Sequence, residues 1–572
     1  MSLPTLDKTY KTHPMKIGKA SLGGKAKGLK FLDRMLSNNP DLHEKFCTVN
    51  LLVPKTIVIA TDGFDDFLSK NKLQTSLFEE ESDEKVAAAF LKGKIPRWIK
   101  SKLRTFLNNF HFPLAIRSSS LLEDARFRAF AGLYRTYMLS NDHPDLEKRL
   151  EHLIQAVKLI YASTYFKAPK SFGERVGHSY KEEKMAVIVQ QVVGDRYGDF
   201  FYPTISGVAQ SHNYYPFAQI KPEEGIATIA MGLGNIVVEG ERALSFSPKY
   251  PQKLLHSSVE DILENAQRYF YCIKLEKKCH PLTINDKSLL TRREVTDAIT
   301  EPPMQLLAST YIPEENRIRD TIQCYGHRVL TFAPILKFGH FPLAKILLKT
   351  LQLCQKEMDC PVEMEFSVNL TSRSKKTKPQ FAFLQIRPMG ARVEQEEIQI
   401  SKEEHSKAFC RSSHALGNSV KKDMQDIVYV RPDTFDTRQT IKIAQEIRQI
   451  NSKLLEENRK YVLIGPGRWG SKDRWLGIPV TWQDISEVGA ILETTSDNIR
   501  SEPSQGSHFF HNISTIGINY FTFSTREDDF FDWDWLMAQS ATKETTFVTH
   551  VKLNSPMTLK VDGRKLEGVI YI

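Results

Sequence analysis

The chain has 572 residues, too many for a single hydrophobic core, so its length alone predicts two to four domains. Hydrophobic residues make up 41% of it, which indicates a globular protein. No apolar run approaches the roughly 20 residues that a membrane-spanning helix needs. The N-terminus has basic residues but no apolar stretch behind them, as a secretory signal would have. We therefore predict a cytoplasmic protein without a membrane partner.

Charge and cysteine content exclude two further classes of protein. The net charge is +10, but the lysines and arginines are scattered among acidic residues. The compact basic run RSKKTK, at residues 373–378, lies between two strand-like segments and is typical of a solvated hairpin tip. We therefore expect no nucleic-acid partner. The seven cysteines form no CxxC pair, which argues against a zinc site, and their odd number argues against a disulfide framework.

The first candidate site along the chain is the glycine-rich segment SLGGKAKGLKFL at residues 21–32. Gly23 and Gly24 permit close approach of the backbone to a ligand, Lys25 supplies a mobile positive charge, and a helical apolar period follows. The segment lacks the GxxxxGK[ST] spacing of a Walker loop, so it would be a different kind of phosphate site. A buried strand at residues 56–60 and a helix come next.

A short apolar strand predicted at residues 114–116 is followed by an arginine and three serines. The apolar residues run directly into Arg117 and Ser118. A guanidinium group is always charged and binds phosphate oxygens in pairs, so this pattern suits a polyphosphate ligand. The alternative is a surface strand that ends in a serine-rich turn, because serines cluster in turns for their own local hydrogen bonds.

The middle of the chain offers a packing helix and two more ligand candidates. Apolar residues recur at helical spacing over residues 145–168. The strand-like segment at residues 185–193 is interrupted by Gln190, which either faces a ligand or is the exposed side of a strand. In AMGLGNIVVEG, residues 230–240, Gly232 and Gly234 let the backbone approach a ligand, and the two valines fit a buried strand edge.

Two alternating segments, at residues 362–368 and 381–388, predict a β-hairpin with one polar face. That face would present the Glu365 carboxylate together with Gln385 and Arg387. Hard oxygen ligands are what Mg²⁺ accepts, usually with ATP phosphates completing its shell. We predict that Glu365 and Gln385 bind Mg²⁺; the alternative is an ordinary amphipathic hairpin.

The last third of the chain changes character. Residues 394–407 are charged and read as a linker, and an amphipathic helix is expected at about 436–455. A strand at residues 461–465 leads into GPGRWGS, in which glycines flank Arg468. This loop is either a second anion site or a tight strand exit. Further candidate strands lie at residues 427–430, 546–553 and 568–572.

Four segments in this order, GGKAKGL, VPKTIVIATDGFDDFL, AIRSSSLLED and AFAGLYRTY, resemble the nucleotide-binding part of phosphoenolpyruvate synthase and pyruvate phosphate dikinase. The resemblance covers roughly residues 15–390 and implies an ATP-grasp fold with Mg-ATP as ligand. It implies that Lys25 and Arg117 reach the ATP phosphates and that the backbone near Gln190 holds adenine. Glu123 and Asp124 match the family's acidic pair.

The chain departs from the family pattern at two places. Arg135 stands before Thr136 where the family has an acidic residue, and Gln210–Asn213 replaces a threonine and an Asp-Pro. Near the C-terminus, His508 follows a Gly-Ser turn and is similar to the family's phosphohistidine, with Gly517 at the expected distance. Aromatic residues follow His508 where the family has small residues. The alternative to a phosphorylated His508 is therefore a buried histidine with a structural role.

Together these features predict an α+β protein with an ATP-grasp module and a smaller α/β C-terminal domain. We assign residues 1–185 to the N-terminal ATP-grasp subdomain, 186–392 to the C-terminal one and 393–572 to the last domain. The residues expected to bind the nucleotide are Gly23, Gly24, Lys25, Arg117, Ser118, Gln190, Gly232, Gly234 and Arg387.

About 180 residues after Met389 are too few for a carrier domain plus a (β/α)₈ barrel of ~250 residues. The predicted function is an ATP-dependent phosphotransferase of the dikinase type, with Arg117, Lys25 and His508 as catalytic residues. Its phosphoryl acceptor is unknown, and another protein is one candidate. The alternatives are a non-catalytic ATP-binding regulatory module and a ligase that forms an acyl phosphate.

Overall fold

The computed structural model describes residues 14–73, 78, 81–121, 132–175, 182–216, 220–254, 258–284, 289–370, 377–389, 397–495, 507–515, 517–523 and 529–572. These residues form two compact units. The first is essentially the chain up to Met389, and the second is Gly390–Ile572 together with Val238–Glu241. Helices and sheets occur in both, so the predicted mixed α+β class is confirmed. The subdivision of the first unit at residue 185 stays a prediction.

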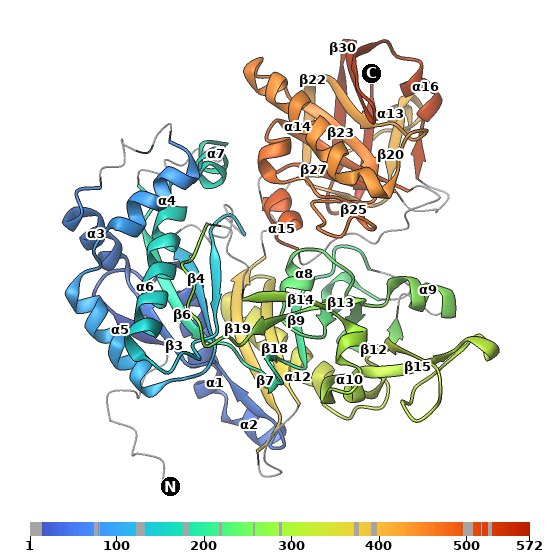
Figure 1. The fold of residues 1–572 in the computed structure, drawn as a ribbon. Coiled ribbons are helices and arrows are strands. Elements are labelled where there is room, and N and C mark those ends of the chain that lie inside the picture. Colours follow the sequence, from blue (N-terminus) through green and yellow to red (C-terminus); the bar gives the residue numbers. More distant parts are fainter. Residues whose placement is uncertain are drawn as a thin grey trace. The chain divides into compact units, whose positions relative to one another are not determined.

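The first unit begins with a sheet covered by helices on both faces (Figure 1). Its strands lie in the order β1 (Met15–Ile17), β3 (Thr56–Ile59), β6 (Met185–Gln191), β4 (Leu114–Ser120) and β5 (Thr136–Leu139). Helix α1 (Gly23–Asn38) packs Ala26 and Leu29 against Val58, Ala186 and Ile188 on one face. The other helices of this region are α3 (Thr61–Lys70), α4 (Asp83–Lys92), α5 (Arg97–Asn109), α6 (Leu146–Ser163) and α7 (Lys167–Arg175). The helix expected over residues 145–168 is confirmed as α6.

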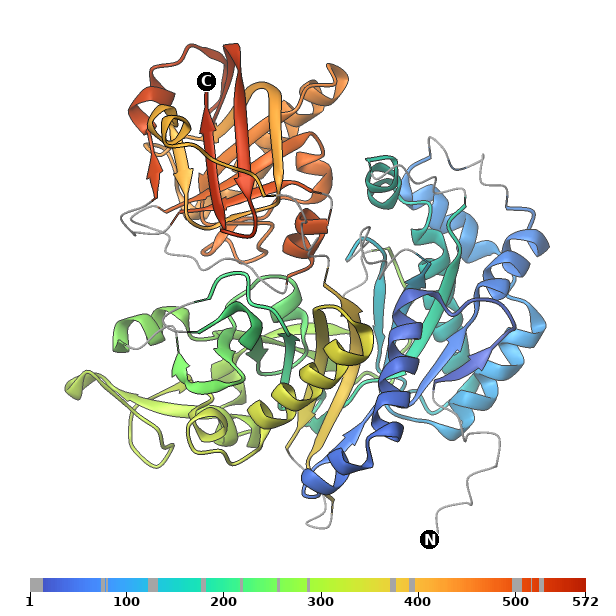
Figure 2. The ribbon, with the colours of Figure 1, turned by 180° about the vertical axis from the view of Figure 1, so that it is seen from behind.

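A second, mostly antiparallel sheet follows in the same unit. Its order is β12 (Tyr250–Leu254), β11 (Leu244–Ser247), β10 (Ile226–Ala230), β9 (Ile205–Gln210), β18 (Val362–Asn369), β19 (Gln380–Pro388) and β2 (Asn50–Leu52). Strand β2 comes from the N-terminal part of the chain yet pairs in parallel with β19. Helix α12 (Leu343–Met358) packs on β18 and β9, and α1 packs on β19 (Figure 2). The N-terminal segment therefore contributes to both sheets.

Two smaller sheets complete the first unit. One runs in the order β14 (Leu290–Glu294), β13 (Tyr269–Lys274), β8 (Phe200–Tyr202) and β7 (Asp195–Tyr197); the other is β16 (Arg317–Arg319), β15 (Ala308–Ile312) and β17 (His327–Leu330). Among the short helices of the unit, α2 (Pro40–Lys45) lies between α1 and β2, α9 (Val259–Asn265) precedes β13, α10 (Pro302–Leu307) lies between the two small sheets, and α11 (Ala333–Leu336) follows β17. The strand expected at Val237 and Val238 is wrong, because both residues lie in the helical turn α8 (Asn235–Val238).

The second unit is built on one large mixed sheet. Its order is β21 (Ala415–Leu416), β27 (Asn519–Thr522), β26 (Val488–Thr494), β23 (Tyr461–Pro466), β22 (Ser419–Val430), β30 (Val548–Asp562), β31 (Glu567–Tyr571), β20 (Cys410–Ser412) and β28 (Phe530–Phe531), with β29 (Ala541–Glu544) on β30. Strands β22, β23, β26 and β27 run parallel. The predicted amphipathic helix is α14 (Thr440–Glu456), which connects β22 to β23 and buries its apolar face. Helix α15 (His508–Thr515) lies between β26 and β27 in sequence, and α16 (Trp533–Met537) between β28 and β29.

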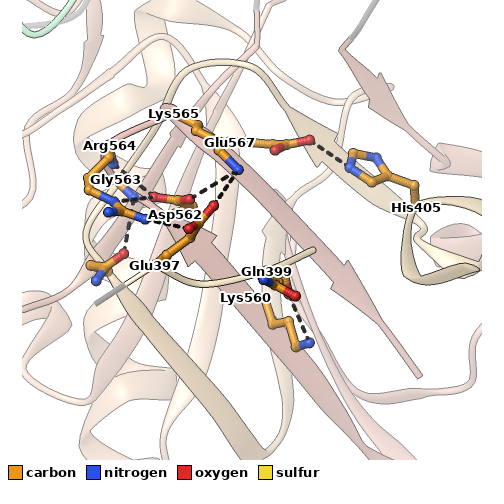
Figure 3. A network of polar contacts seen from close by, with 10 residues as sticks. Glu397, Gln399, His405, Lys560, Asp562, Gly563, Arg564, Lys565 and Glu567 are labelled. Atoms are coloured by element: carbon orange, nitrogen blue, oxygen red, sulfur yellow. Dashed lines mark hydrogen bonds and ion pairs between the residues drawn. The ribbon is translucent and has the colours of Figure 1, made fainter. Parts of the chain in front are cut away.

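The charged segment expected to be a linker is instead an ordered edge of the second unit in its described part, residues 397–407. Helix α13 (Lys402–Lys407) begins with a capping box between Ser401 and Glu404. Figure 3 shows how the charges of this segment pair with the β30–β31 hairpin: His405 contacts Glu567, and Glu397 contacts Lys565. Complementary charges on the two segments, rather than apolar burial, explain why it packs there.

Two general features bear on earlier expectations. No helix within the described ranges is both long and apolar enough to cross a membrane. No disulfide bond joins any of the seven cysteines, all of which lie in the described ranges.

Candidate functional site

Three polar side chains from three strands of the first unit meet at one point. Arg117, on β4, donates from Nη2 to Glu365 Oε2 at 2.8 Å and to Gln385 Oε1 at 2.6 Å. Its Nη1 also donates to the Leu384 carbonyl at 3.3 Å. The Arg117 and Glu365 side chains are 14% and 15% exposed, so the pair is accessible without being fully solvated. Two oxygens of the chemical kind that binds cations and a guanidinium, which suits anions, therefore share this position.

The hairpin register explains why Glu365 and Gln385 lie together. Strands β18 and β19 are antiparallel, and Glu365 stands directly opposite Gln385. The register shifts after Glu365, so that Phe366 faces Phe383 and Leu384 is skipped. A residue skipped in this way leaves the ladder, which frees the Leu384 carbonyl for Arg117. The predicted hairpin is confirmed, with the bulge as a feature that alternation alone did not indicate.

The glycine-rich segment lies directly on the strand that carries Arg117. The Ala26 amide donates to Ser119 Oγ at 3.1 Å, and Ser119 Oγ donates to the Leu22 carbonyl at 2.9 Å. Gly23 has φ +75°, and a Cβ there would lie 1.8 Å from the Ser119 carbonyl oxygen. At this glycine the closely approaching group is therefore the protein's own backbone. Lys25 follows in the first turn of α1 and is largely buried.

Helix α1 also explains how β4 and β19 are held in reach of each other. Besides its contact with Ser119, it carries Gly28, where a Cβ would lie 2.5 Å from the Ile386 carbonyl oxygen. Two close contacts on one helix thus tie Arg117's strand to Gln385's strand. Because side chains alternate along a strand, Ser119 shares a face with Arg117, and Ser118 lies on the opposite face; both serines are fully buried. Alternation could have identified Ser119, which the motif-based prediction omitted.

Arg387 is placed differently from Arg117. Its Nε donates to Glu363 Oε1 at 2.8 Å and its Nη2 binds the same oxygen, while Gln210 Nε2 donates to Glu363 Oε2 at 2.6 Å. The Arg387 and Glu363 side chains are only 4% and 2% exposed. The departure from the family pattern at Gln210 therefore completes a buried ionic cluster two residues along the hairpin from the Glu365–Gln385 pair.

The remaining predicted ligand residues of the first unit are dispersed. Gln190 is buried on β6 and donates to Thr56 Oγ1 at 3.3 Å. Gly232 has φ +85°, and its Cβ position is 2.7 Å from the Tyr271 carbonyl oxygen. At Gly234 an added Cβ would lie 3.7 Å from Ser206 Cβ, an ordinary van der Waals contact, so this position has room for a side chain. Gly24 is the second residue of α1.

Three other residues of the family pattern have different outcomes. Glu123 and Asp124 lie outside the described residues. The Arg135 guanidinium lies 5.8 Å from the centre of the Phe166 ring. No group of three or more His, Cys, Asp or Glu side chains within the described ranges could hold a metal ion. The Glu365 carboxylate and the Gln385 amide oxygen are oxygen ligands of the kind that Mg²⁺ accepts when phosphate and water complete its shell, and their role as metal ligands stays a prediction.

In the second unit, His508 is the first residue of α15. The residue after it, Phe509, packs on Gly470, where a Cβ would lie 2.3 Å from the ring. The loop that carries Arg468 and the start of α15 therefore touch. Within GPGRWGS, Gly470 therefore allows this packing, and it has φ +77°.

A buried carboxylate that the sequence reasoning missed lies at the carboxyl end of β26. Glu493 is 3% exposed; its Oε1 accepts from the Trp469 amide at 3.1 Å and from the Tyr520 hydroxyl. Its Oε2 is buried without a hydrogen-bond partner among the described residues. Burial raises the pKa of Glu493 to about 7 in spite of those hydrogen bonds. In the sequence, Glu493 directly follows the apolar run VGAIL, just as Arg117 directly follows an apolar run. This pattern of a charged residue after an apolar run could have identified Glu493.

With this geometry in view, comparison with known proteins decides the family. Residues 19–408 match the family model described as pyruvate phosphate dikinase, AMP/ATP-binding domain. The chain belongs to this family. It is also similar to an uncharacterized phosphotransferase, YvkC, of Bacillus subtilis (strain 168), with 28% identity over 193 residues. That match covers 33% of this chain and 20% of the relative, so the chain spans about a fifth of the relative's length. The resemblance of the N-terminal motifs to this dikinase family is confirmed.

Proposed function

We propose that the chain is an ATP-dependent phosphotransferase of the dikinase type whose first unit is an ATP-grasp module for Mg-ATP. The observation that supports this best is the convergence of Arg117, Glu365 and Gln385 in a chain of the dikinase nucleotide-binding family. A guanidinium suits phosphate oxygens, and a carboxylate beside an amide oxygen suits Mg²⁺.

In this proposal the residues divide the charge of the triphosphate between them. Lys25 and Arg117 neutralise phosphate oxygens as charge develops, which is how phosphoryl transfer is generally stabilised. Glu365 and Gln385 hold Mg²⁺, which when bound neutralises further phosphate charge. The roles of Gly24, Ser118, Gln190 and Gly234 toward the nucleotide stay predictions. Gly23 and Gly232 approach the protein's own backbone, and buried Arg387 acts through Glu363.

The phosphoryl group would pass to a histidine, for which His508 is the candidate. A ring nitrogen of His508 would attack phosphorus while the bond to the leaving nucleotide oxygen breaks. The start of a helix favours a negatively charged group, which suits a phosphorylated side chain at this position. The final acceptor would be another molecule, and a second protein is one candidate.

ATP labelled at the β or the γ phosphate tests this proposal. We expect protein-bound label in the wild type, no label in His508→Ala, and unchanged label in His405→Ala, a partly exposed histidine of the same unit. AMP plus phosphate as products would support the dikinase reaction, whereas ADP would favour an acyl-phosphate ligase. A wild type that neither consumes ATP nor takes up label would contradict phosphotransfer.

A second candidate function is a regulatory module that binds ATP without consuming it. The replacement residues Arg135 and Gln210 favour it, since Gln210 has a purely internal contact with Glu363. Such a module would show an ATP-dependent rise in unfolding temperature without ATP turnover. At about 100 times the dissociation constant, ligand binding stabilises a protein by ~2.7 kcal/mol, which a thermal melt resolves.

A further inference from the structure

We infer that Arg117 competes with a divalent metal ion for Glu365 and Gln385, so that metal occupies this site only together with nucleotide. The inference rests on the proposed Mg-ATP site and adds an order of binding to it. The guanidinium acts as the counter-ion of the metal ligands whenever phosphate is absent.

The hydrogen bonds give the competition its geometry. Nη2 of Arg117 carries two hydrogens, and it contacts one oxygen of Glu365 at 2.8 Å and one of Gln385 at 2.6 Å. The Gln385 side chain has a single oxygen, so a metal ion held by both residues would need an oxygen that Arg117 already occupies, beside a carboxylate whose other oxygen faces the guanidinium's charge. The Leu384 carbonyl, freed by the bulge, holds the adjacent Nη1 at 3.3 Å. Three acceptors on one hairpin therefore fix the guanidinium over the oxygen pair.

Charge balance gives the competition its direction. Glu365 and Arg117 neutralise each other, so a divalent ion added beside both would leave an excess of two positive charges at a mostly buried position. A triphosphate changes this balance because it offers Arg117 paired anionic acceptors. Once Arg117 turns to phosphate, the carboxylate and amide oxygens are released to the metal.

A second ion pair on the same hairpin shows that not every pair here is suited to exchange. Arg387 and Glu363 are 4% and 2% exposed, and Gln210 also binds the carboxylate. Separating such a pair leaves a buried charge without a partner, which is strongly unfavourable. The Arg117–Glu365 pair is several times more exposed, so its partners can be replaced by ligand and water. The hairpin thus carries one fixed pair and one exchangeable pair.

Binding of Mn²⁺ to the nucleotide-free full chain, followed by electron paramagnetic resonance, tests the inference without any assay of turnover. We expect weak binding in the wild type. Arg117→Met should raise the Mn²⁺ affinity by about tenfold or more, because a hydrogen bond to a charged group is worth at least that factor. Arg117→Gln should raise it in the same direction and replaces the methionine variant if that variant does not fold.

Two controls locate the effect. Arg293 forms a similar ion pair elsewhere in the unit, 3.0 Å from Glu301. The two side chains are 10% and 18% exposed, which is close to the exposure of Arg117 and Glu365. The first control, Arg293→Met, removes this arginine. It should leave the Mn²⁺ affinity unchanged. Adding Glu365→Gln to Arg117→Met should abolish the gain, because the new ion is held by Glu365.

Three results would overturn the inference: tight Mn²⁺ binding by the nucleotide-free wild type, no gain in either Arg117 variant, or a gain that survives Glu365→Gln. Equilibrium dialysis of Mg-ATP against the wild type separates this failure from failure of the proposed function. Binding of Mg-ATP without the Mn²⁺ gain would leave the proposed function standing and remove only the order of binding. Absence of Mg-ATP binding would remove both.

Discussion

The buried carboxylate of Glu493 predicts that the second unit loses stability as the pH rises toward neutrality. The pKa of Glu493 in the folded chain is about 7, raised by burial from an ordinary value of 4.5. Between these two values the folded state keeps a proton that the unfolded state has released. The contribution is therefore fully present below pH 4.5 and lost as the pH passes about 7.

The size of the effect follows from the same two values. The interval between 4.5 and about 7, at about 1.4 kcal/mol per pH unit, corresponds to about 3 kcal/mol in the free energy of unfolding. The Glu493→Gln variant has no proton to release, so its stability should lack this slope. Its amide oxygen can still accept from the Trp469 amide and the Tyr520 hydroxyl, which keeps the local structure.

Urea unfolding followed by tryptophan fluorescence at several pH values between 4.5 and 8 measures this effect. The signal reports mainly on the second unit, because most of the tryptophans lie there. These are Trp469, Trp475, Trp482, Trp533 and Trp535, against Trp98 in the first unit. Glu456→Gln, at an exposed position of α14, should keep the wild-type slope. Equal slopes in the wild type and Glu493→Gln would refute the reasoning, because the buried carboxylate would then not retain its proton.

Three further predictions concern the first unit. Gly23→Ala should lower the free energy of unfolding of the first unit by about 1–2 kcal/mol or more in a thermal melt, because the left-handed conformation alone costs that much and the new Cβ meets the Ser119 carbonyl; no loss of stability would contradict this close approach. Ser119→Ala removes the hydrogen bonds of Ser119 Oγ to α1, so it should destabilise the unit by about 1 kcal/mol in a thermal melt and weaken ATP binding. An equal effect on ATP binding from Ser118→Ala would show that the face of the strand does not matter. Arg387→Met should destabilise by about 3–5 kcal/mol, and a double change with Glu363→Met should recover part of that loss; no recovery would contradict the coupling.

Local patterns predicted most individual elements of this fold. Two helices, the one expected over residues 145–168 and α14, were predicted from apolar residues at helical spacing. That spacing depends only on positions along the chain. The alternation of residues 362–368 and 381–388 likewise predicted the hairpin and its polar face. Where the pattern was short, it failed: Val237 and Val238 have strand-forming side chains but sit in a helical turn between two loops. The charged residues 397–407 were misread because their partners lie on β30 and β31, more than 140 residues away.

The sequence placed Arg117 at the end of a strand, which is wrong, because β4 (Leu114–Ser120) continues three residues beyond it. The sequence by itself determined the family and the pairing of Glu365 with Gln385. These follow from motif order and from the period of two along a strand. Only the tertiary structure decided that all three groups meet, that Arg117 already binds both predicted metal ligands, and that Arg387 is buried against Glu363. The physical reason is that α1 joins the two sheets through Ser119 and Gly28. Contacts of that kind link residues hundreds of positions apart, and no local pattern in the chain specifies them.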